Sequence, residues 1–447
     1  MQKDLYVIVG LGLTGLSCAR YLASQHIPFA VNDTRDNPPL LAQFRETFPD
    51  QSIVLGKLDE SLLENASGLI VSPGVSIKNP LIAKQIARGI EVIGDIELFA
   101  RMKKAPVIAI TGTNAKSTVT TLVGEMAIQS GLNTAVGGNL GIPVLDFVLQ
   151  KKAAELFVLE LSSFQLETTY SLAPEVATVL NITPDHMDRY TTLAEYATAK
   201  KNVYKNCSVA VCNRDDILTD CGLDFQKQKL HFTLKQPQQN EFGLIQKKRD
   251  IYLALEDQLL MPVAELPILG RHYQANALAA LAIGHGYGFS LNSMIDALKK
   301  FKGLPHRCQL VSILKGVFWY NDSKGTNVGA TLAAIEGLGA DMQGKMILIA
   351  GGVSKNADFS PLIPVVQKYI KVMILMGEAA PLLEDIFGQY VKIYFVKSMA
   401  EAVNLAESIS KAPDIVLLSP ACASLDMFKN FEHRGEVFMQ SVSELKN

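Results

Sequence analysis

The chain has 447 residues, too many for one ordinary domain, and its length predicts two to four domains of roughly 100–200 residues each. Hydrophobic residues make up 48% and charged residues 19%, which is typical of globular proteins. A net charge of -2 indicates no basic surface for nucleic acid, and no apolar run is long enough for a membrane helix. We therefore expect neither nucleic acid nor a membrane as a partner.

The six cysteines have none of the spacings that predict a zinc site or a disulfide framework. The first residues, MQKDLYVIVGLGLTGLS, lack the basic segment and the cleavage site of a signal peptide. We therefore expect a reduced protein in the cytoplasm.

Short apolar runs alternate with amphipathic segments along most of the chain. Continuous apolar strands separated by helices predict an α/β fold, with parallel sheets covered by helices on both faces. The segment 228–261 differs, because its pattern predicts antiparallel hairpins with a turn at KKRD. The predicted strands are 5–10, 28–33, 68–74, 106–112, 156–161, 176–183, 209–213, 317–322, 346–352, 372–377, 392–396 and 414–420, and clear helices are 16–25, 117–131 and 399–410.

The first glycine cluster follows the first predicted strand and opens a helix. Gly10, Gly12 and Gly15 have the spacing of a dinucleotide-binding turn, and Asp33 lies at the end of the second strand. Glycines there let backbone N–H groups approach a diphosphate at a helix N-terminus. The cluster fits NAD, a sugar nucleotide, or a tight turn without a ligand. NDTR (32–35) and SPG (72–74) follow strands that end near the same crevice.

The second cluster is TGTNAKST (111–118), between a predicted buried strand and a helix. Backbone amides there would hold phosphates, Lys116 would reach the β- and γ-phosphates, and Ser117 or Thr118 would bind Mg²⁺. The usual phosphate loop has glycine where Ile110 and Ala115 stand. Should Ala115 adopt a positive φ, it would cost roughly 1 kcal/mol.

Several motifs follow one another in the order found in one enzyme family. Together they resemble the Mur ligases, the ATP-dependent amino-acid-adding enzymes of peptidoglycan synthesis, and the resemblance covers essentially the whole chain. GLGLTGLS, NDTR, SPG and SPACASLDMFKNFEHRG (419–435) are similar to the D-glutamate-adding branch of that family. The ordered motifs are TGTNAKST, LELSSFQLE (159–167), NITPDHMDRY (181–190), GLPHR (303–307) and NDSKGTN (321–327).

The resemblance implies a two-step reaction. The carboxylate of UDP-N-acetylmuramoyl-L-alanine attacks the γ-phosphate of ATP and forms an acyl phosphate. The amine of D-glutamate then attacks this intermediate and expels phosphate. Both steps move charge among anions, so they need cations and metal ions more than a covalent nucleophile. The resemblance also implies two Mg²⁺ ions and a monomer.

The resemblance assigns roles to individual residues. The catalytic residues would be Lys116, His186 and Lys200. Lys200 matches a carbamylated lysine, which would supply an anionic oxygen to Mg²⁺. The metal ligands would be Ser117, Glu160, His186 and carbamylated Lys200. ATP would be bound by Gly112, Thr113, Asn114, Ala115, Lys116, Ser117, Thr118, Asn276, Arg307 and Asp322; the uridine diphosphate sugar by Leu13, Thr14, Asp33, Thr34, Arg35, Ser72, Gly74 and Asn139; and D-glutamate by Thr326, Lys355, Ser424 and Phe431.

We expect three α/β domains. A Rossmann-like domain (1–94) would hold the uridine diphosphate end of the substrate, and a central ATPase domain with a mostly parallel sheet (95–303) would follow. A second Rossmann-like domain (304–447) would hold D-glutamate. The boundaries fall near Gly94 and Gly303, where helices precede fresh strands.

Three alternatives remain open from the sequence. An NAD-dependent oxidoreductase would use the first glycine cluster, but it leaves TGTNAKST, Glu160 and His186 without a role. A non-catalytic nucleotide-binding relative is suggested by Ala115 alone. The third alternative is a ligase of the same family for another amino acid.

Overall fold

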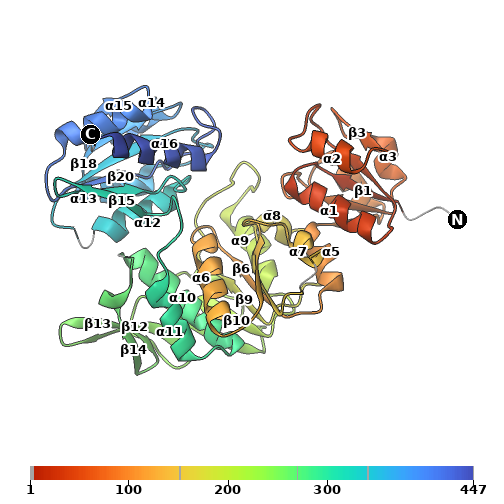
Figure 1. The fold of residues 1–447 in the computed structure, drawn as a ribbon, viewed down its shortest axis with the longest axis horizontal. Coiled ribbons are helices and arrows are strands. Elements are labelled where there is room, and N and C mark those ends of the chain that lie inside the picture. Colours follow the sequence, from red (N-terminus) through yellow and green to blue (C-terminus); the bar gives the residue numbers. More distant parts are fainter. Residues whose placement is uncertain (1–4, 151–152, 269, 340–341, 446–447) are drawn as a thin grey trace. The chain divides into compact units, whose positions relative to one another are not determined.

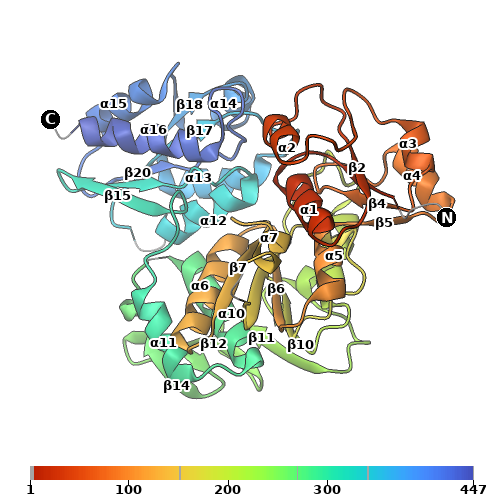
Figure 2. The same cartoon turned by 45° about the vertical axis from the view of Figure 1, so that its right-hand side comes forward.

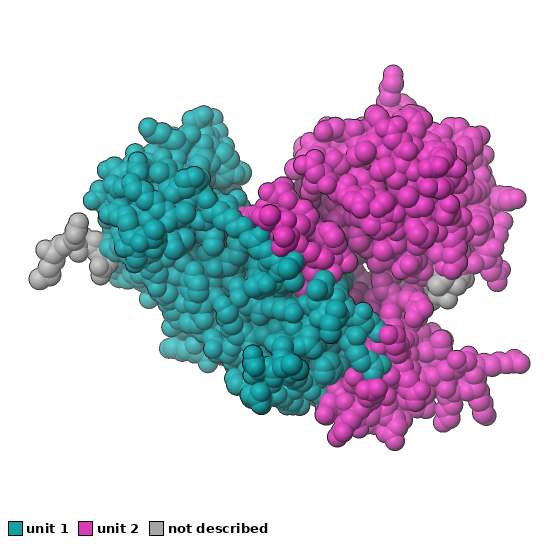
Figure 3. All heavy atoms as spheres, turned by 180° about the vertical axis from the view of Figure 1, so that it is seen from behind, with its two compact units in different colours: residues 1–181, 194–232, 279–297 teal, residues 182–193, 233–278, 298–447 magenta. Residues whose placement is uncertain are grey.

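A computed structural model of the chain describes residues 5–150, 153–268, 270–339 and 342–445. The chain forms two compact units, which Figure 3 colours separately. Unit 1 consists of residues 1–181, 194–232 and 279–297, and unit 2 of residues 182–193, 233–278 and 298–447. No helix in the described part of the chain is both long and apolar enough to cross a bilayer.

Unit 1 begins with a five-stranded parallel sheet in the order β3-β2-β1-β4-β5. This sheet belongs to the red N-terminal part of the chain in Figure 1. The strand order reverses between β1 and β4, and in such sheets ligands bind at the carboxyl ends beside this switch point. The predicted glycine cluster follows β1, and SPG follows β4. The elements are β1 (Tyr6–Val9), α1 (Leu13–Ser24), β2 (Phe29–Asn32), α2 (Leu41–Thr47), β3 (Ile53–Val54), α3 (Glu60–Glu64), β4 (Gly68–Val71), α4 (Pro80–Ala87), β5 (Glu91–Ile93) and α5 (Asp95–Met102).

The second sheet of unit 1 is parallel, with its strands in the order β11-β10-β9-β6-β8-β7. Strand β6 lies between β8 and β9, so the loop that leaves β6 begins between two neighbouring strands and not at a sheet edge. Figure 2 labels β6 and β7 of this sheet, with α6 beside them. The elements are β6 (Val107–Thr111), α6 (Lys116–Gln129), β7 (Thr134–Gly138), α7 (Val144–Val148), β8 (Leu156–Glu160), α8 (Ser163–Leu166), β9 (Val176–Val179), α9 (Leu193–Lys201), η1 (Asn202–Tyr204), β10 (Val209–Asn213), η2 (Ile217–Thr219) and β11 (Gln228–Phe232).

The hairpin prediction for 228–261 is confirmed in part. Strands β12 (Glu241–Lys247), β13 (Asp250–Leu255) and β14 (Gln258–Pro262) are antiparallel, and the first turn falls within KKRD. The pattern did not predict that β11 also pairs in parallel with β10, to which residues 214–227 return the chain. The meander leads to η3 (Val263–Glu265), α10 (Arg271–Tyr287) and α11 (Leu291–Lys300).

Unit 2 also contains a six-stranded sheet in the order β15-β16-β20-β17-β18-β19, parallel except for β15. Met346 and Leu348 of β17 pack in one apolar core with α12, α13 and α14, whereas Ile347 and Ile349 pack in another with α15 and α16. Alternate residues thus reach opposite faces, both covered by helices, as a continuous apolar strand predicts. The elements are β15 (Gln309–Leu314), β16 (Val317–Asn321), α12 (Val328–Gly339), β17 (Met346–Gly351), η4 (Ser360–Leu362), α13 (Ile363–Tyr369), β18 (Ile370–Met376), α14 (Ala380–Phe387), β19 (Lys392–Phe395), α15 (Met399–Ile409), β20 (Ile415–Leu418) and α16 (Phe431–Glu444).

The predicted α/β class with mostly parallel sheets is therefore confirmed. Most predicted strands are present in the structure, whereas β3, β5, β7 and β15 were not predicted.

Candidate functional site

The loop from β6 to α6 has the geometry of a phosphate-binding loop. Gly112 has a φ of 155°, which favours glycine, and a Cβ atom there would crowd Cβ of Leu180 at 3.0 Å. Ala115 is the residue before the helix and has φ 66° and ψ -5°, the left-handed region in which alanine is strained. Nζ of Lys116 donates to the carbonyl oxygen of Thr113 at 2.8 Å. Ser117 and Thr118 are buried in the first turn of the helix.

Asn181, a residue for which the sequence predicted no role, holds this loop. Its carbonyl oxygen accepts a hydrogen bond from the amide of Thr113, and its Oδ1 accepts one from the amide of Asn114, both at 2.8 Å. Its Nδ2 donates in return to the carbonyl oxygen of Asn114 at 3.2 Å. Asn181 opens the motif NITPDHMDRY, and its place directly after a buried strand was the available signal.

Glu160 is the last residue of β8, the strand next to β6, and it is 3% exposed. Its Oε1 accepts a hydrogen bond from Nδ2 of Asn139 at 2.8 Å. Its Oε2 is buried and has no hydrogen-bond partner among the described residues. An ionised carboxylate with an unsatisfied buried oxygen suits a Mg²⁺ ligand, because the ion would supply the missing interaction.

Lys200 is 1% exposed near the end of α9. Its Nζ donates to the carbonyl oxygen of Gly112 at 2.7 Å and lies 4.6 Å from the ring centroid of Tyr196. The structure therefore brings Lys200 to the phosphate loop, across 88 residues of sequence.

In the first sheet, Asp33 organises the glycine turn. Its Oδ2 accepts hydrogen bonds from the amide of Leu11 and from Nη2 of Arg35, both at 2.7 Å, while Oδ1 accepts from the amide and from Nε of Arg35 at 2.9 Å. Burial of Asp33 acts to raise its pKa, but these hydrogen bonds outweigh it and hold the pKa below its ordinary value. Oγ of Ser72 donates to the carbonyl oxygen of Gly10 at 2.9 Å. Leu13 is 67% exposed beside this turn.

Three further predicted residues of the uridine diphosphate site lie in the segments that follow β1, β2 and β4. Thr14 is in the first turn of α1, while Thr34 and Gly74 lie in the loops after β2 and β4. No atom would come within 4 Å of a Cβ added at Gly74.

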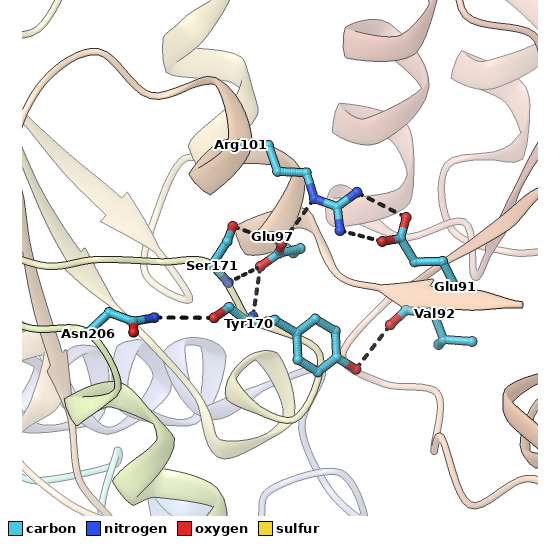
Figure 4. Close-up of polar contacts among 7 residues, drawn as sticks. All are labelled: Glu91, Val92, Glu97, Arg101, Tyr170, Ser171 and Asn206. Carbon is cyan, nitrogen blue, oxygen red and sulfur yellow. Dashed lines mark hydrogen bonds and ion pairs between the residues drawn. The ribbon is translucent and has the colours of Figure 1, made fainter. Parts of the chain in front are cut away.

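The first and second sheets of unit 1 are joined by a polar network around α5, drawn in Figure 4. Oε2 of Glu97 accepts hydrogen bonds from the amides of Tyr170 and Ser171 at 2.7 and 2.8 Å, and its Oε1 accepts one from Oγ of Ser171 at 2.8 Å. Arg101 donates to Glu97 and pairs with Glu91 at 2.6 Å. Helix α5 is thereby fixed to the loop that follows α8.

Unit 2 contains the other predicted ATP residues. Asp322 follows β16 and is buried, and its Oδ2 and Oδ1 accept hydrogen bonds from Oγ of Ser419 at 2.7 Å and from the amide of Cys308 at 3.1 Å. Burial raises the pKa of Asp322 to about 6, against the lowering effect of these two hydrogen bonds. Arg307 immediately precedes Cys308, and Asn276 lies within α10, half-buried.

A cavity of about 310 Å³ in unit 2 brings together three of the predicted residues, His186, Thr326 and Lys355. His186 and Lys355 both have positive φ, 57° and 52°, so each side chain projects from a sharply turned loop. The lining residues are Thr183, Pro184, Asp185, His186, Met187, Thr326, Asn327, Val328, Gly329, Leu332, Ser354, Lys355, Asn356, Ala357, Asp358, Pro361 and Ala421.

Ser424 and Phe431, the other two predicted D-glutamate residues, do not line this cavity. Ser424 is 3% exposed, and the ring of Phe431 lies 3.8 Å from Nζ of Lys324. Lys324 was missed from the sequence, although it lies within NDSKGTN. Arg434, also missed, is buried and donates to the carbonyl oxygens of Ser323 and Cys422, so it links the two loops that carry Thr326 and Ser424.

No group of three or more His, Cys, Asp or Glu side chains among the described residues is placed to hold a metal ion. A metal at either predicted position would therefore need ligands from other side chains or from bound phosphate oxygens.

Three family models match the chain in order. The Mur ligase MurD-like N-terminal domain matches residues 4–94, the Mur ligase middle domain matches 110–284, and the Mur ligase glutamate ligase domain matches 306–422.

Curated relatives match along nearly their whole length. The chain is 50% identical over 444 residues to the UDP-N-acetylmuramoylalanine–D-glutamate ligase of Coxiella burnetii, covering 99% of the chain and 100% of that protein. It is 50% identical over 439 residues to the enzyme of the same name from Pseudomonas aeruginosa, covering 98% of each.

Solved structures share the fold at low identity. The MurC ligase of Thermotoga maritima superposes with a TM-score of 0.62 at 16% identity, covering 98% of this chain and 99% of that one. MurF of Thermotoga maritima, solved with ADP, gives 0.62 at 16%, covering 99% and 96%. With half of its residues identical to those of curated relatives from end to end, the chain belongs to the Mur ligase family.

Proposed function

We propose that the chain is an ATP-dependent ligase that joins D-glutamate to UDP-N-acetylmuramoyl-L-alanine and releases ADP and phosphate. The observation that carries this proposal is the end-to-end identity of 50% with ligases named for that reaction. The relatives match the amino-acid-binding part of the chain as well as the ATP-binding part, which favours D-glutamate over another amino acid.

In the proposed first step, the substrate carboxylate attacks the γ-phosphorus of ATP, the bond to the β,γ-bridging oxygen breaks, and ADP leaves. Lys116, at the start of α6, would neutralise the β- and γ-phosphates. The amides of residues 112–117 would hold their oxygens at the helix N-terminus. The hydrogen bonds from Asn181 support this role, because they order the loop before a ligand arrives.

In the proposed second step, the amine of D-glutamate attacks the acyl phosphate carbon and expels phosphate. The cavity that contains His186, Thr326 and Lys355 has the size for a small amino acid, and Lys355 supplies a positive charge for one of its carboxylates. Lys355 would pair with the side-chain carboxylate, and Thr326, Ser424 and Phe431 would complete the pocket. Exclusion of water there would protect the acyl phosphate from hydrolysis.

The described residues fit a magnesium requirement. Ser117 and Glu160 would hold one Mg²⁺, supported by the buried and unsatisfied Oε2 of Glu160. His186 and Lys200, the latter as a carbamate, would hold a second. When bound, these ions neutralise charge on phosphate oxygens as it moves between groups. Lys200 is buried beside the loop at residues 111–118, where a carbamate would supply an anionic oxygen to the ion.

The uridine diphosphate end of the substrate would bind at the switch point of the first sheet. Leu13, Thr14, Thr34, Arg35, Ser72, Gly74 and Asn139 would make the contacts, with Asp33 among them. Asp33 would act chiefly by ordering the turn at Leu11, since both its oxygens already accept hydrogen bonds. The same observation disfavours an NAD-dependent oxidoreductase, in which this carboxylate would bind the ribose.

We place the reaction in cytoplasmic peptidoglycan precursor synthesis, carried out by a monomer without nucleic-acid or membrane partners. The net charge of -2 and the small polar substrates support this setting.

A coupled ADP-release assay tests the function. Purified protein should release ADP only when ATP, Mg²⁺, UDP-N-acetylmuramoyl-L-alanine and D-glutamate are all present, and Lys116→Ala should abolish the release. Replacement of D-glutamate by L-lysine or meso-diaminopimelate should give no turnover. ATP left untouched by the full mixture, or equal turnover with another amino acid, would overturn the proposal.

A further inference from the structure

Asp185 lies in the loop that precedes α9 and is mostly buried, with 12% of its side chain exposed against 39% for the neighbouring His186. Its Oδ1 accepts a hydrogen bond from the amide of His186 at 2.9 Å. The backbone of His186 is in the left-handed region, with φ 57°, which residues other than glycine adopt uncommonly and at a cost that surrounding contacts must offset. The carboxylate of Asp185 supplies one such contact.

The second oxygen of Asp185 reaches a different part of the chain. Nδ2 of Asn327 donates to Oδ2 of Asp185 at 3.0 Å, across 142 residues of sequence. Oδ1 of Asn327 accepts a hydrogen bond from the amide of Ala330 at 2.8 Å and so satisfies a backbone donor in the first turn of α12. Asp185 and Asn327 therefore connect the turn at His186 to the start of this helix.

These two residues both line the 310 Å³ cavity, and each lies next to a residue proposed to bind substrate or metal. Asp185 precedes His186, and Asn327 follows Thr326. The hydrogen bond between them fixes one wall of the cavity against another, so the spacing of His186 and Thr326 depends on it.

We infer that Asp185 is a positioning residue for the D-glutamate step, acting through Asn327 rather than by touching substrate. This inference rests on the proposed function for the identity of the amino acid. The donor and acceptor pattern makes it testable, because the amide and the carboxylate can be exchanged. After the exchange, the side-chain amide at position 185 could accept a hydrogen bond from the backbone N–H of His186 through its oxygen and donate one to position 327 through its nitrogen. The carboxylate at position 327 could accept that hydrogen bond with one oxygen and the backbone N–H of Ala330 with the other.

The experiment compares the parent with Asp185→Asn, Asn327→Asp and the exchanged double variant. In Asp185→Asn one of the two hydrogen bonds is lost in either amide orientation, and in Asn327→Asp two carboxylates face each other. Each single variant should lower kcat/KM for D-glutamate about tenfold or more, without changing KM for ATP or for UDP-N-acetylmuramoyl-L-alanine. The double variant should return to within about threefold of the parent.

Asp188→Asn is the matched control, since Asp188 is an exposed carboxylate in the same loop and should behave as the parent does. Should the double variant remain as impaired as Asp185→Asn, the carboxylate acts on substrate, on metal or on Nε2 of His186, which lies 3.7 Å from its Oδ2, and the inference is wrong.

Thermal unfolding of the same four proteins gives a readout that does not depend on turnover. The single variants should lower Tm by roughly 2–4 °C and the double variant should recover it. Single variants that leave Tm unchanged would overturn the inference. A parent that releases no ADP with D-glutamate would overturn the proposed function alone, because the Tm comparison still decides whether Asp185 and Asn327 are coupled.

Discussion

The side-chain amide of Asn139 holds one oxygen of Glu160 at 2.8 Å, while the other oxygen of that carboxylate is buried without a hydrogen-bond partner among the described residues. Asn139 thus orients Glu160 and leaves one oxygen for a ligand. Asn139 follows the last residue of β7 and Glu160 ends the adjacent strand β8, so side chains separated by 21 residues of sequence are in direct contact.

This pair gives the first prediction. Glu160→Gln should lower kcat about 100-fold or more, because a neutral amide is a poor ligand for Mg²⁺. Asn139→Ala should cost about 10- to 100-fold, as removal of an orienting partner does at metal sites. ADP release measured over a range of Mg²⁺ concentrations is the check. A Glu160→Gln variant with the parental Mg²⁺ dependence would rule out the metal role.

Ala115→Gly should stabilise the protein. Ala115 has a φ of 66°, and glycine adopts this conformation without strain, so the free energy of unfolding should rise by about 1 kcal/mol. KM for ATP should change little if the methyl group is clear of the phosphates. Denaturant unfolding and the ADP assay measure the two effects. A large gain in turnover would show instead that alanine impairs the loop.

Glu97→Gln should destabilise unit 1 by about 2 kcal/mol, because the buried carboxylate accepts three hydrogen bonds from residues 170–171 and an amide can accept only some of them. Its ion pair with Arg101 adds less, since the Arg101 side chain is 38% exposed. Thermal unfolding measures the loss. Lys84→Gln is the control, since its ion pairs with Glu60 and Glu64 are exposed and their loss should leave Tm unchanged. Equal effects of the two substitutions would contradict the structural role given to Glu97.

His272 predicts a pH dependence of stability. Burial lowers the pKa of His272 to about 4, against an ordinary value of 6.5, and its Nδ1 is buried without a hydrogen-bond partner among the described residues. The unfolded chain therefore takes up a proton at higher pH than the folded chain. The contribution of His272 to the free energy of unfolding is fully present above pH 6.5. It is lost as the pH falls towards 4, and the loss is at most about 3 kcal/mol.

Unfolding curves recorded from about pH 7 to about pH 4 should show this loss in the parent and a smaller one in His272→Gln. Parallel curves for the two proteins would mean that His272 does not titrate as its burial implies.

The sequence predicted the sheets well where strands were long and continuously apolar, as in β6, β8 and β17. It missed β3 and β5 because they have only two and three residues, and β15 because its alternating pattern belongs to an edge strand. It did not predict that β11 pairs in parallel with β10, since a strand's own residues do not specify whether its neighbour runs parallel. The domain boundaries at 94 and 303 stay predictions.

The candidate site was predictable where chemistry and local spacing coincide, as in residues 111–118. The residues that support it were not. Asn181, Asp185, Asn327 and Arg434 act through contacts with distant segments, and a sequence without a fold cannot indicate which amide meets which carboxylate. Asp33 is the opposite case, because the motif predicts that it contacts a ligand. In the structure both of its carboxylate oxygens accept hydrogen bonds from the protein itself, from Leu11 and Arg35.

The network in Figure 4 bears on how the protein could be divided. A cut after Gly94 would place Glu91 on one fragment and its partner Arg101 on the other, and would separate the amide of Gly94 from the carbonyl oxygen of Thr168. The N-terminal fragment, expressed alone, would then expose an unpaired sheet end and a lone carboxylate. The two fragments, when co-expressed, should reassociate through these contacts. Gly94 is the boundary that the pattern of strands and helices predicts, yet these contacts make it a poor place to truncate the chain.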